Sequence, residues 1–240
     1  MTRHAVYRRK IVTPESFMAM AGPHYRERND YPTCPSCKVR LEPYGVHSTK
    51  VQSRFDHPNG SVCPPSSTPD RRYAHLCPSD WDLEQGERLY AEFCRPENLK
   101  SAYMVCWAII GKLTGKEFLR MCQQAVNRNI FSYQGLSLAI LPYILVTLVD
   151  LPISKDREFP VRVVLSKPKG PIDDLWIHPE QCSLRFYFAD TGRPMQRPEL
   201  SIPCPPAEQA RTNTGWISDN LYDILKACCE EHGRQSRVSG

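Results

Sequence analysis

The chain has 240 residues and a formal net charge of +5, and 41% of its residues are hydrophobic against 24% charged. This balance supplies enough apolar material for a packed core and excludes a fully disordered chain. The longest apolar run, residues 136–152, is shorter than the roughly 20 residues of a membrane-spanning helix and contains Pro142. We therefore expect one large domain, or a small module joined to a larger one, with no membrane partner.

The cysteine content indicates a reducing compartment. The eleven cysteines are an odd number, and the opening stretch MTRHAVYRRKIV is basic and lacks the apolar segment of a signal peptide. Several cysteines fall on apolar faces of expected helices, where cysteine packs as a small hydrophobic residue. We expect a cytoplasmic protein in which some cysteines bind metal and most others pack.

The positive charge is concentrated near the N-terminus. Residues 1–75 hold 12 lysines and arginines against 6 acidic residues, a net charge of +6, whereas residues 76–240 hold 19 against 20, a net charge of −1. Such an excess beside a small module is typical of a surface that binds a polyanion. The alternative is that the excess charge serves only solubility.

The N-terminal region predicts a metal-stabilised module. Residues 16–22 predict one short strand or a helical turn, and residues 31–78 are rich in Pro, Gly, Ser, Cys and His with few long apolar side chains. A metal would have to supply the stability that such a stretch cannot draw from a core. Residues 39–55 have the pattern of a hairpin, with Gly45 near its turn.

The spacing of cysteine and histidine predicts a structural zinc site. A Cys-x-x-Cys pair on a tight turn directs two thiolates at one point, and a His-x5-Cys pair follows 20 residues later. The sequence has no HExxH or deaminase motif, and four protein ligands would leave no coordination position for water. The predicted zinc ligands are Cys34, Cys37, His57 and Cys63, although His75 or Cys77 could replace one member of the second pair.

The remainder of the chain predicts helices followed by strands. Helices are expected from Ser79 with a capping box to Asp82, over residues 96–110, and from Thr114 with Glu117 as its capping-box partner. Residues 143–149, 160–167 and 182–190 predict strands, and residues 218–233 predict a closing helix before a disordered tail.

These elements together predict an α+β fold. An N-terminal zinc ribbon is followed by a helical layer and a small, mostly antiparallel sheet with a C-terminal helix. The expected division is a basic zinc-ribbon module over residues 1–78, an α+β domain over residues 79–233 and a tail over residues 234–240.

The stretch YPTCPSCKVRL…RFDHPNGSVCP resembles the N-terminal zinc ribbon of CoiA-like proteins, a bacterial competence-associated family. The resemblance covers about residues 20–80. It implies a ribbon that precedes a restriction-endonuclease-like domain. The positions that match the family pattern are Tyr31, Cys34, Pro35, Cys37, Phe55, His57 and Cys63.

The nuclease chemistry of that family needs an Asp/Glu-x-Lys motif that holds Mg²⁺ and polarises water. In this sequence no lysine has an acidic residue two positions before it, and no phosphate loop or nucleophile elbow is present. The carboxylates near the expected strands are instead interpreted as loop charges. They are Asp150, Asp156, Glu158, Asp173 and Asp174.

We therefore predict a non-catalytic protein that binds nucleic acid, acts as an adaptor subunit of a bacterial DNA-processing, mobile-element or phage-defence assembly, or does both. The alternative is a divergent metal-dependent nuclease that uses Asp173 or Asp174. Tyr7, Tyr25, Tyr44 or Phe55 would stack on bases. The predicted phosphate contacts are Arg8, Arg9, Lys10, Arg26, Arg28, Lys38, Arg40, Lys50 and Arg54.

Overall fold

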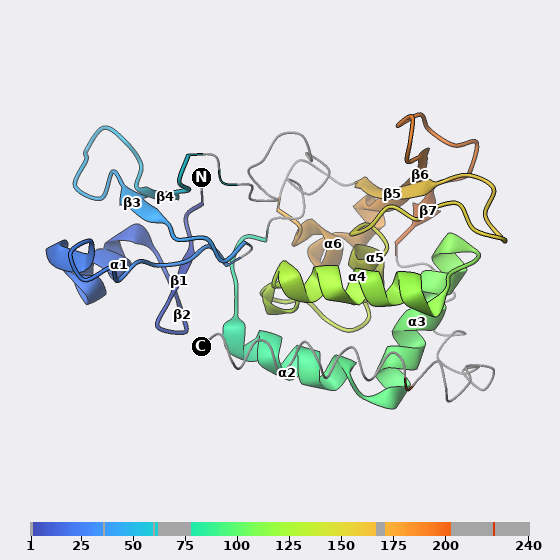
Figure 1. Ribbon diagram of the computed structural model, residues 1–240, viewed down its shortest axis with the longest axis horizontal. Helices are drawn as coiled ribbons and strands as arrows, with labels where there is room; N and C mark the ends of the chain where they lie inside the picture. The colour runs from blue at the N-terminus through green and yellow to red at the C-terminus, as the bar shows by residue number, and fades with distance from the viewer. Residues whose placement is uncertain are drawn as a thin grey trace.

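The computed structural model describes residues 2–35, 37–59, 61, 78–166, 171–202 and 223. The buried hydrophobic residues form two clusters, one built from residues 5–55 and the other from residues 81–202. Figure 1 shows the N-terminal elements on one side of the molecule, and the longer helices with the three-stranded sheet on the other. Within the described residues, none of the helices combines the length and the apolar character needed to cross a bilayer.

The chain opens with a hairpin and a helix. Strands β1 (Ala5–Tyr7) and β2 (Lys10–Val12) pair antiparallel, and the two residues between them have positive φ, as tight hairpin turns require. Helix α1 (Pro14–Ala21) follows, with Thr13 as its N-cap in a capping box with Ser16. The expected short element at residues 16–22 is therefore part of a helix.

A second hairpin carries the residues between the cysteine pair and the histidine. After the 3₁₀ turn η1 (Pro23–Tyr25), strands β3 (Glu42–Tyr44) and β4 (Arg54–Asp56) pair antiparallel. Gly45 follows β3 directly with a φ of +74°, a conformation that favours glycine. The predicted hairpin is confirmed, with its paired strands limited to the two ends of the expected segment.

The N-terminal elements share a core of their own. Phe17 of α1 is fully buried and makes edge-to-face contacts with Tyr7, Tyr25 and Phe55 at ring-centroid distances of 5.0, 5.2 and 6.1 Å. The described part of the stretch 31–78, expected to lack a core of its own, packs against a core built mainly by the residues before it. The stretch after residue 30 supplies three buried residues, and the other six come from the first 25 residues. The cluster is Ala5, Tyr7, Val12, Phe17, Ala21, Tyr25, Cys34, Leu41 and Phe55.

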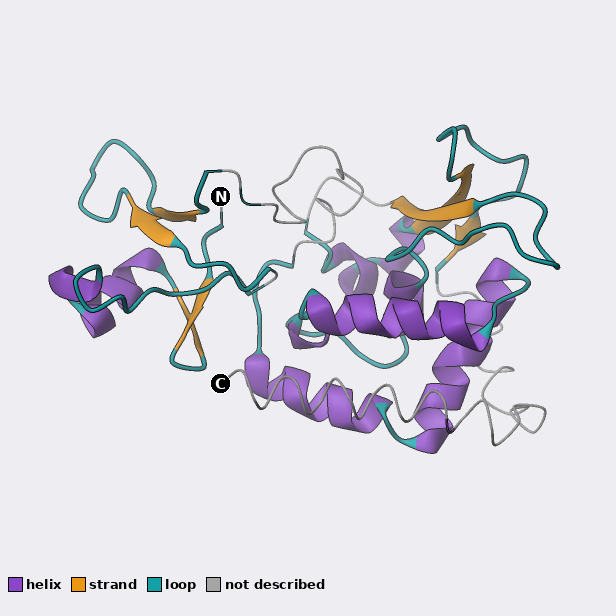
Figure 2. Ribbon diagram, in the orientation of Figure 1, coloured by secondary structure: helices purple, strands orange, loops and turns teal. Residues whose placement is uncertain are grey.

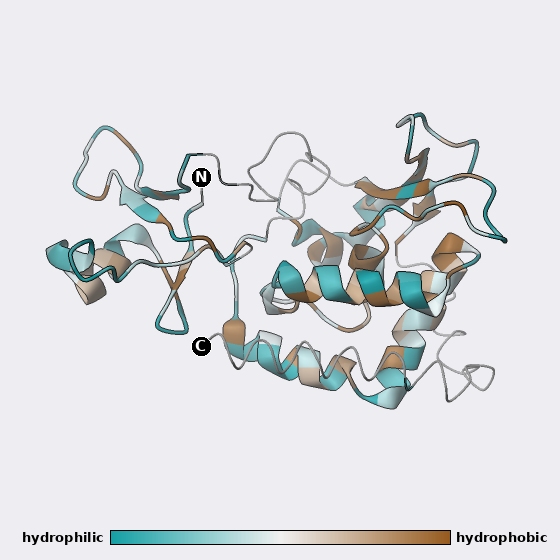
Figure 3. Ribbon diagram, viewed as in Figure 1, coloured by the Kyte–Doolittle hydropathy of each residue, from teal (hydrophilic) through white to brown (hydrophobic). Residues whose placement is uncertain are grey.

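Three helices form the predicted helical layer. They are α2 (Leu83–Phe93), α3 (Pro96–Ile110) and α4 (Gly115–Asn127). Thr114 and Glu117 form the expected capping box of α4. Figure 3 shows hydrophobic residues along one face of α4 and hydrophilic residues along the other.

The expected start of α2 at Ser79 is wrong. The N-cap is Asp82, whose carboxylate accepts a hydrogen bond from the Gln85 amide at 2.8 Å. The Ser79 amide donates instead to the carboxylate of Asp173, 94 residues away, so a distant contact takes the place of the expected local cap.

The strand expected over residues 143–149 is also wrong. After the 3₁₀ turn η3 (Ile130–Ser132), the chain forms helix α5 (Leu141–Leu145), with Pro142 in its first turn. Leu141 to Val149 are all buried, so no alternation of exposed and buried positions marks the segment. A short apolar run buried on every side fits a helix or a strand equally well by pattern, and the proline favours a helix start.

The predicted strands at residues 160–167 and 182–190 are confirmed. Strands β5 (Val161–Ser166), β6 (Ser183–Phe188) and the two-residue β7 (Leu200–Ser201) form an antiparallel sheet in the order β5-β6-β7. Helix α6 (Asp174–Ile177) and the 3₁₀ turn η4 (Pro179–Gln181) lie between β5 and β6 in the chain. Helices and small antiparallel sheets confirm the α+β class (Figure 2). The expected C-terminal helix, apart from Asp223, and the tail lie outside the described residues.

The two clusters meet at the first hairpin. The Arg9 guanidinium in the turn between β1 and β2 lies 2.6 Å from the Glu87 carboxylate on α2. The His4 ring packs against Trp81 with a centroid distance of 6.0 Å, and Ile11 of β2 packs on the larger cluster. The first hairpin therefore belongs to the smaller core and also contacts the beginning of the helical layer.

Helix α2 approaches η3 so closely that one position admits only glycine. A Cβ at Gly86 would lie 2.2 Å from Ser132 Oγ and 2.8 Å from Ser132 Cα. We expect Gly86→Ala to destabilise the protein by about 1–3 kcal/mol, because the alanine must push α2 away from the backbone at Ser132. Urea unfolding followed by circular dichroism measures the effect.

The control is Glu92→Ala, on the exposed face of the same helix. Its effect should stay within about 0.5 kcal/mol. An exposed glycine-to-alanine change in a helix normally stabilises by up to about 1 kcal/mol. A stabilising Gly86→Ala would therefore contradict the close packing at Ser132.

Candidate metal centre and basic surface

Cys34 and Cys37 lie on a tight turn closed by backbone hydrogen bonds. The Lys38 amide donates to the Cys34 carbonyl at 2.9 Å, and the Cys34 amide donates to the Val39 carbonyl at 2.8 Å. Lys38 has a φ of +62°, which turns the chain back after the second cysteine. Cys34 is buried in the small core, whereas Cys37 is half-buried at its edge.

The second hairpin brings His57 to these cysteines. His57 follows β4 directly, and the neighbouring Phe55 is fully buried and pairs with Pro43 of β3. One ligand atom from each of Cys34, Cys37 and His57 lies within 4.8 Å of the other two. Three of the four predicted ligands, which span 23 positions from Cys34 to His57, therefore meet at one point.

The spacing of these atoms fits a tetrahedral zinc ion. The Cys37 Sγ and the His57 Nε2 are 3.5 Å apart. Zinc binds thiolate sulfur at about 2.3 Å and imidazole nitrogen at about 2.0–2.1 Å, and a tetrahedral angle then places the two ligand atoms about 3.6 Å apart. The hairpin and the cysteine turn thus hold two donors near their coordinating separation.

Two side chains that can carry positive charge, His57 and Lys38, interact with the two thiols. Hydrogen bonds to Cys34 and Cys37 raise the pKa of His57 to about 9, outweighing the opposing effect of burial. Burial lowers the pKa of Lys38, and the nearby thiols act against that shift. A cation bound among these three side chains would take over the charge compensation that His57 and Lys38 provide.

The other ring nitrogen of His57, Nδ1, is buried, and its hydrogen-bond partner is not among the described residues. A zinc-bound histidine normally donates its second ring N–H to a neighbouring group. Cys63, His75 and Cys77 lie outside the described residues, so the fourth ligand stays a prediction.

Four of the nine residues predicted to contact phosphates have their positive charge compensated by an ion pair with a carboxylate. The shortest nitrogen–oxygen distances in these pairs range from 2.6 to 3.3 Å. Three of the pairs join residues 16 to 78 positions apart, so no local sequence pattern predicts them. The pairs are Arg8 with Asp30, Arg9 with Glu87, Arg26 with Glu42 and Arg54 with Asp56.

Three others donate to neutral oxygens and form no ion pair with a carboxylate among the described residues. Arg28 and Lys38 donate to the carbonyls of Ala21 and Pro35, and Arg40 donates to the Asn29 side chain at 2.7 Å. The last two, Lys10 and Lys50, are exposed. No ion pair joins either lysine to another described residue.

The aromatic residues expected to stack on bases are mostly in the core. Tyr7, Tyr25 and Phe55 are 3%, 4% and 0% exposed, so their faces are not accessible, and that expectation is wrong for them. The fourth, Tyr44, is 48% exposed, and the Arg54 guanidinium lies over its ring. Sequence alone does not separate the four, since each is an aromatic residue within the same basic segment.

Several carboxylates near the expected strands have structural partners. Asp173 is buried and accepts a hydrogen bond from the Ser79 amide at 2.8 Å. Asp150 forms a two-point ion pair with Arg162 at 2.9 and 2.8 Å. The cysteine–histidine cluster is the one candidate metal site within the described residues, so these carboxylates form no second one.

Comparison with protein-family models, with curated proteins and with solved structures found no match. The resemblance to CoiA-like zinc ribbons, which rests on seven residues of the N-terminal region, therefore stays a prediction. The cysteine–histidine cluster and the charges around it are the observations from which a function can be argued.

Proposed function

We propose that the protein is a non-catalytic nucleic-acid-binding protein whose N-terminal module is a zinc ribbon held by a structural Zn²⁺. The observation that carries the proposal is the convergence of Cys34, Cys37 and His57 from a cysteine turn and the end of a hairpin. A turn followed by a hairpin and a second ligand pair is the layout of a zinc ribbon. Cys63 would complete the coordination.

The charge of the module supports nucleic acid as the partner. The described residues up to position 61 include 10 lysines and arginines but 5 acidic residues, a net charge of +5. Three of those acids compensate Arg8, Arg26 and Arg54. The uncompensated cations include Lys10, Arg40 and Lys50, and positive charge of this kind binds phosphates without regard to sequence.

The rest of the chain fits an adaptor better than an enzyme. Asp173, the first carboxylate that a nuclease could use, is buried against the Ser79 amide. The α+β elements would dock on a protein partner within a bacterial DNA-processing, mobile-element or phage-defence assembly. The zinc module would then present nucleic acid to that assembly.

The proposal is tested by metal analysis and salt-dependent binding on the purified full-length chain. We expect one zinc per chain and binding to labelled oligonucleotides that weakens as salt rises. If the five excess charges contact phosphates, the slope of log K against log salt concentration is about −3.5 for a single strand. Fluorescence anisotropy at several salt concentrations measures this slope.

The control compares two pairs of exposed lysines. Lys10→Gln with Lys50→Gln should make the salt slope shallower by about 1.4, whereas Lys116→Gln with Lys155→Gln in the larger unit should leave it unchanged. A wild-type protein that binds neither DNA nor RNA at low salt would overturn the proposed function.

A further inference from the structure

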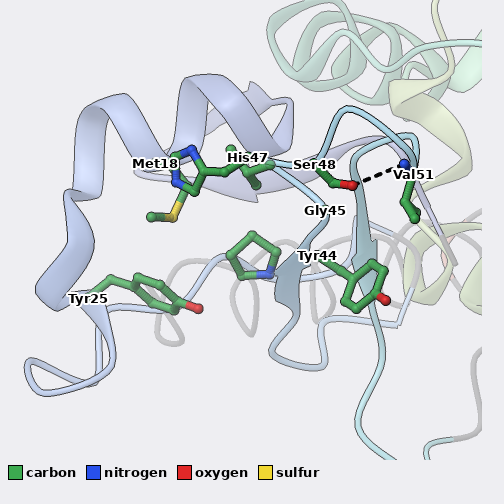
Figure 4. A pocket seen from close by; sticks show the side chains of 9 residues that line it. Met18, Tyr25, Tyr44, Gly45, His47, Ser48 and Val51 are labelled. Carbon is green, nitrogen blue, oxygen red and sulfur yellow. Dashed lines mark hydrogen bonds between the residues drawn. The ribbon is translucent and has the colours of Figure 1, made fainter.

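A groove in the N-terminal module lies beside the turn of the second hairpin. It has a volume of about 440 Å³, inside the roughly 300–1,000 Å³ range of small-molecule sites. Figure 4 shows Tyr25 and Tyr44 at opposite ends of the side chains around it, with Met18 and His47 between α1 and the hairpin loop. The lining is mostly apolar and aromatic, so it suits a flat ring better than a charged group.

Three cationic side chains lie near this apolar lining, and two of them, Arg26 and Arg54, are ion-paired with Glu42 and Asp56. The Arg54 guanidinium lies 4.4 Å from the centre of the Tyr44 ring, and the Arg26 guanidinium lies 5.6 Å from the centre of the Tyr25 ring. The loop that lines the groove also carries the exposed Lys50. A ligand with a flat apolar part and a negative part would match both features.

We propose that this groove binds a base of single-stranded nucleic acid, stacked on Tyr44, with its phosphates held by the cations at the rim. The inference rests on the proposed function and gives it a site. Tyr44 is the exposed member of the aromatic set, and Arg54, which is paired with Asp56, lies over one face of its ring. A base would stack on the opposite face. The ring is therefore held in place by β3 and by its contact with Arg54.

The proposed ligand is single-stranded because stacking on Tyr44 requires the face of a base to be exposed. In a duplex each base is stacked between its neighbours and offers only its edge, so a face is available only after unstacking. A flexible single strand provides that face at little cost. The groove lies on the hairpin that also carries His57, so metal binding would position the stacking surface.

The experiment measures binding of a labelled oligo-dT and of a duplex of equal length to the full chain. Tyr44→Ala should weaken single-strand binding by roughly 5- to 150-fold, the range for removing one stacking ring. Tyr44→Phe, which keeps the ring, should stay within about twofold of wild type. Duplex binding should change little in either variant, and a bromouracil-containing strand should cross-link to the peptide that carries Tyr44.

The matched control is Phe159→Ala, because Phe159 is a 47% exposed aromatic residue outside the N-terminal module. It should leave single-strand binding unchanged. If the wild type binds but Tyr44→Ala behaves like Phe159→Ala, the groove is not the site and the proposed function stands. If the wild type binds no nucleic acid, both proposals fail. Capture of a peptide rather than a strand at Tyr44 would also overturn the inference.

Discussion

Replacing Cys34 by serine should remove the zinc and unfold the N-terminal module. Cys34 is 3% exposed and is both a predicted ligand and part of the small core. Loss of an outer-shell partner of a metal ligand already costs about 10–100-fold in metal affinity, so loss of a ligand should cost more. Metal analysis after dialysis against a weak chelator should find zinc in the wild type and none in the variant.

We expect Cys34→Ser to unfold the N-terminal module because the core of that module is small. Nine residues form the smaller cluster, and a unit of about 60 residues buries only about 60% of its surface on folding. Structural zinc binds peptides of this kind with an apparent free energy of about 10–16 kcal/mol. That amount is comparable to the whole stability of a typical domain, about 5–15 kcal/mol, so we expect the module to depend on the proposed metal.

The control is Cys94→Ser, at the C-terminal end of α2 and outside the cluster of ligands. It should keep one zinc per chain. Limited trypsin digestion should cleave Cys34→Ser rapidly among the arginines of the N-terminal region, while the helical layer resists, because Cys34 does not belong to the larger cluster. Full zinc content in Cys34→Ser would overturn the assignment of the ligand.

The parts of the fold that could be predicted have signals within a few residues of each other. The α4 capping box joins Thr114 to Glu117, and α3 starts at Pro96 and ends before Gly111, as their residue preferences predict. The start of α2 was wrong because Asp173, far along the chain, binds the Ser79 amide. The small core was missed for the same reason, since it joins residues 5–25 to Leu41 and Phe55.

In the candidate site, too, features with short-range sequence signals could be predicted and those that depend on long-range contacts could not. Cys34 and Cys37 are three positions apart, and their type and spacing predict a shared metal, which the meeting with His57 supports. The basic surface depends on long-range pairing instead. Asp30 and Glu42 neutralise arginines that composition alone counts as free, and burial decides which aromatic ring is accessible.

Replacing Arg157 by methionine should cost about 3–5 kcal/mol of stability, because it leaves a buried carboxylate without its partner. The side chains of Arg157 and Glu117 are each 8% exposed, and Nη1 lies 2.7 Å from Oε1. Arg157 also donates to the carbonyls of Lys112 and Pro152. This loss of stability should lower the Tm by roughly 6–20 °C for a chain of this length. Arg88→Met, which breaks the exposed pair with Glu84, should cost about 0.5 kcal/mol or less.

A double variant separates the lost attraction from the unpaired charge. Burial by itself raises the pKa of Glu117, but the hydrogen bonds from Arg157 and from Thr114 outweigh it and hold the pKa below its usual value. Without Arg157 the carboxylate must take up a proton or stay charged in the core, and both cost free energy. Arg157→Met combined with Glu117→Gln removes that charge, so the double variant should be more stable than Arg157→Met alone. If the double variant is less stable than Arg157→Met, the buried charge is not the main cause of the lost stability. The loss would then come from the weakened Thr114–Glu117 capping box and from the carbonyls that Arg157 no longer contacts.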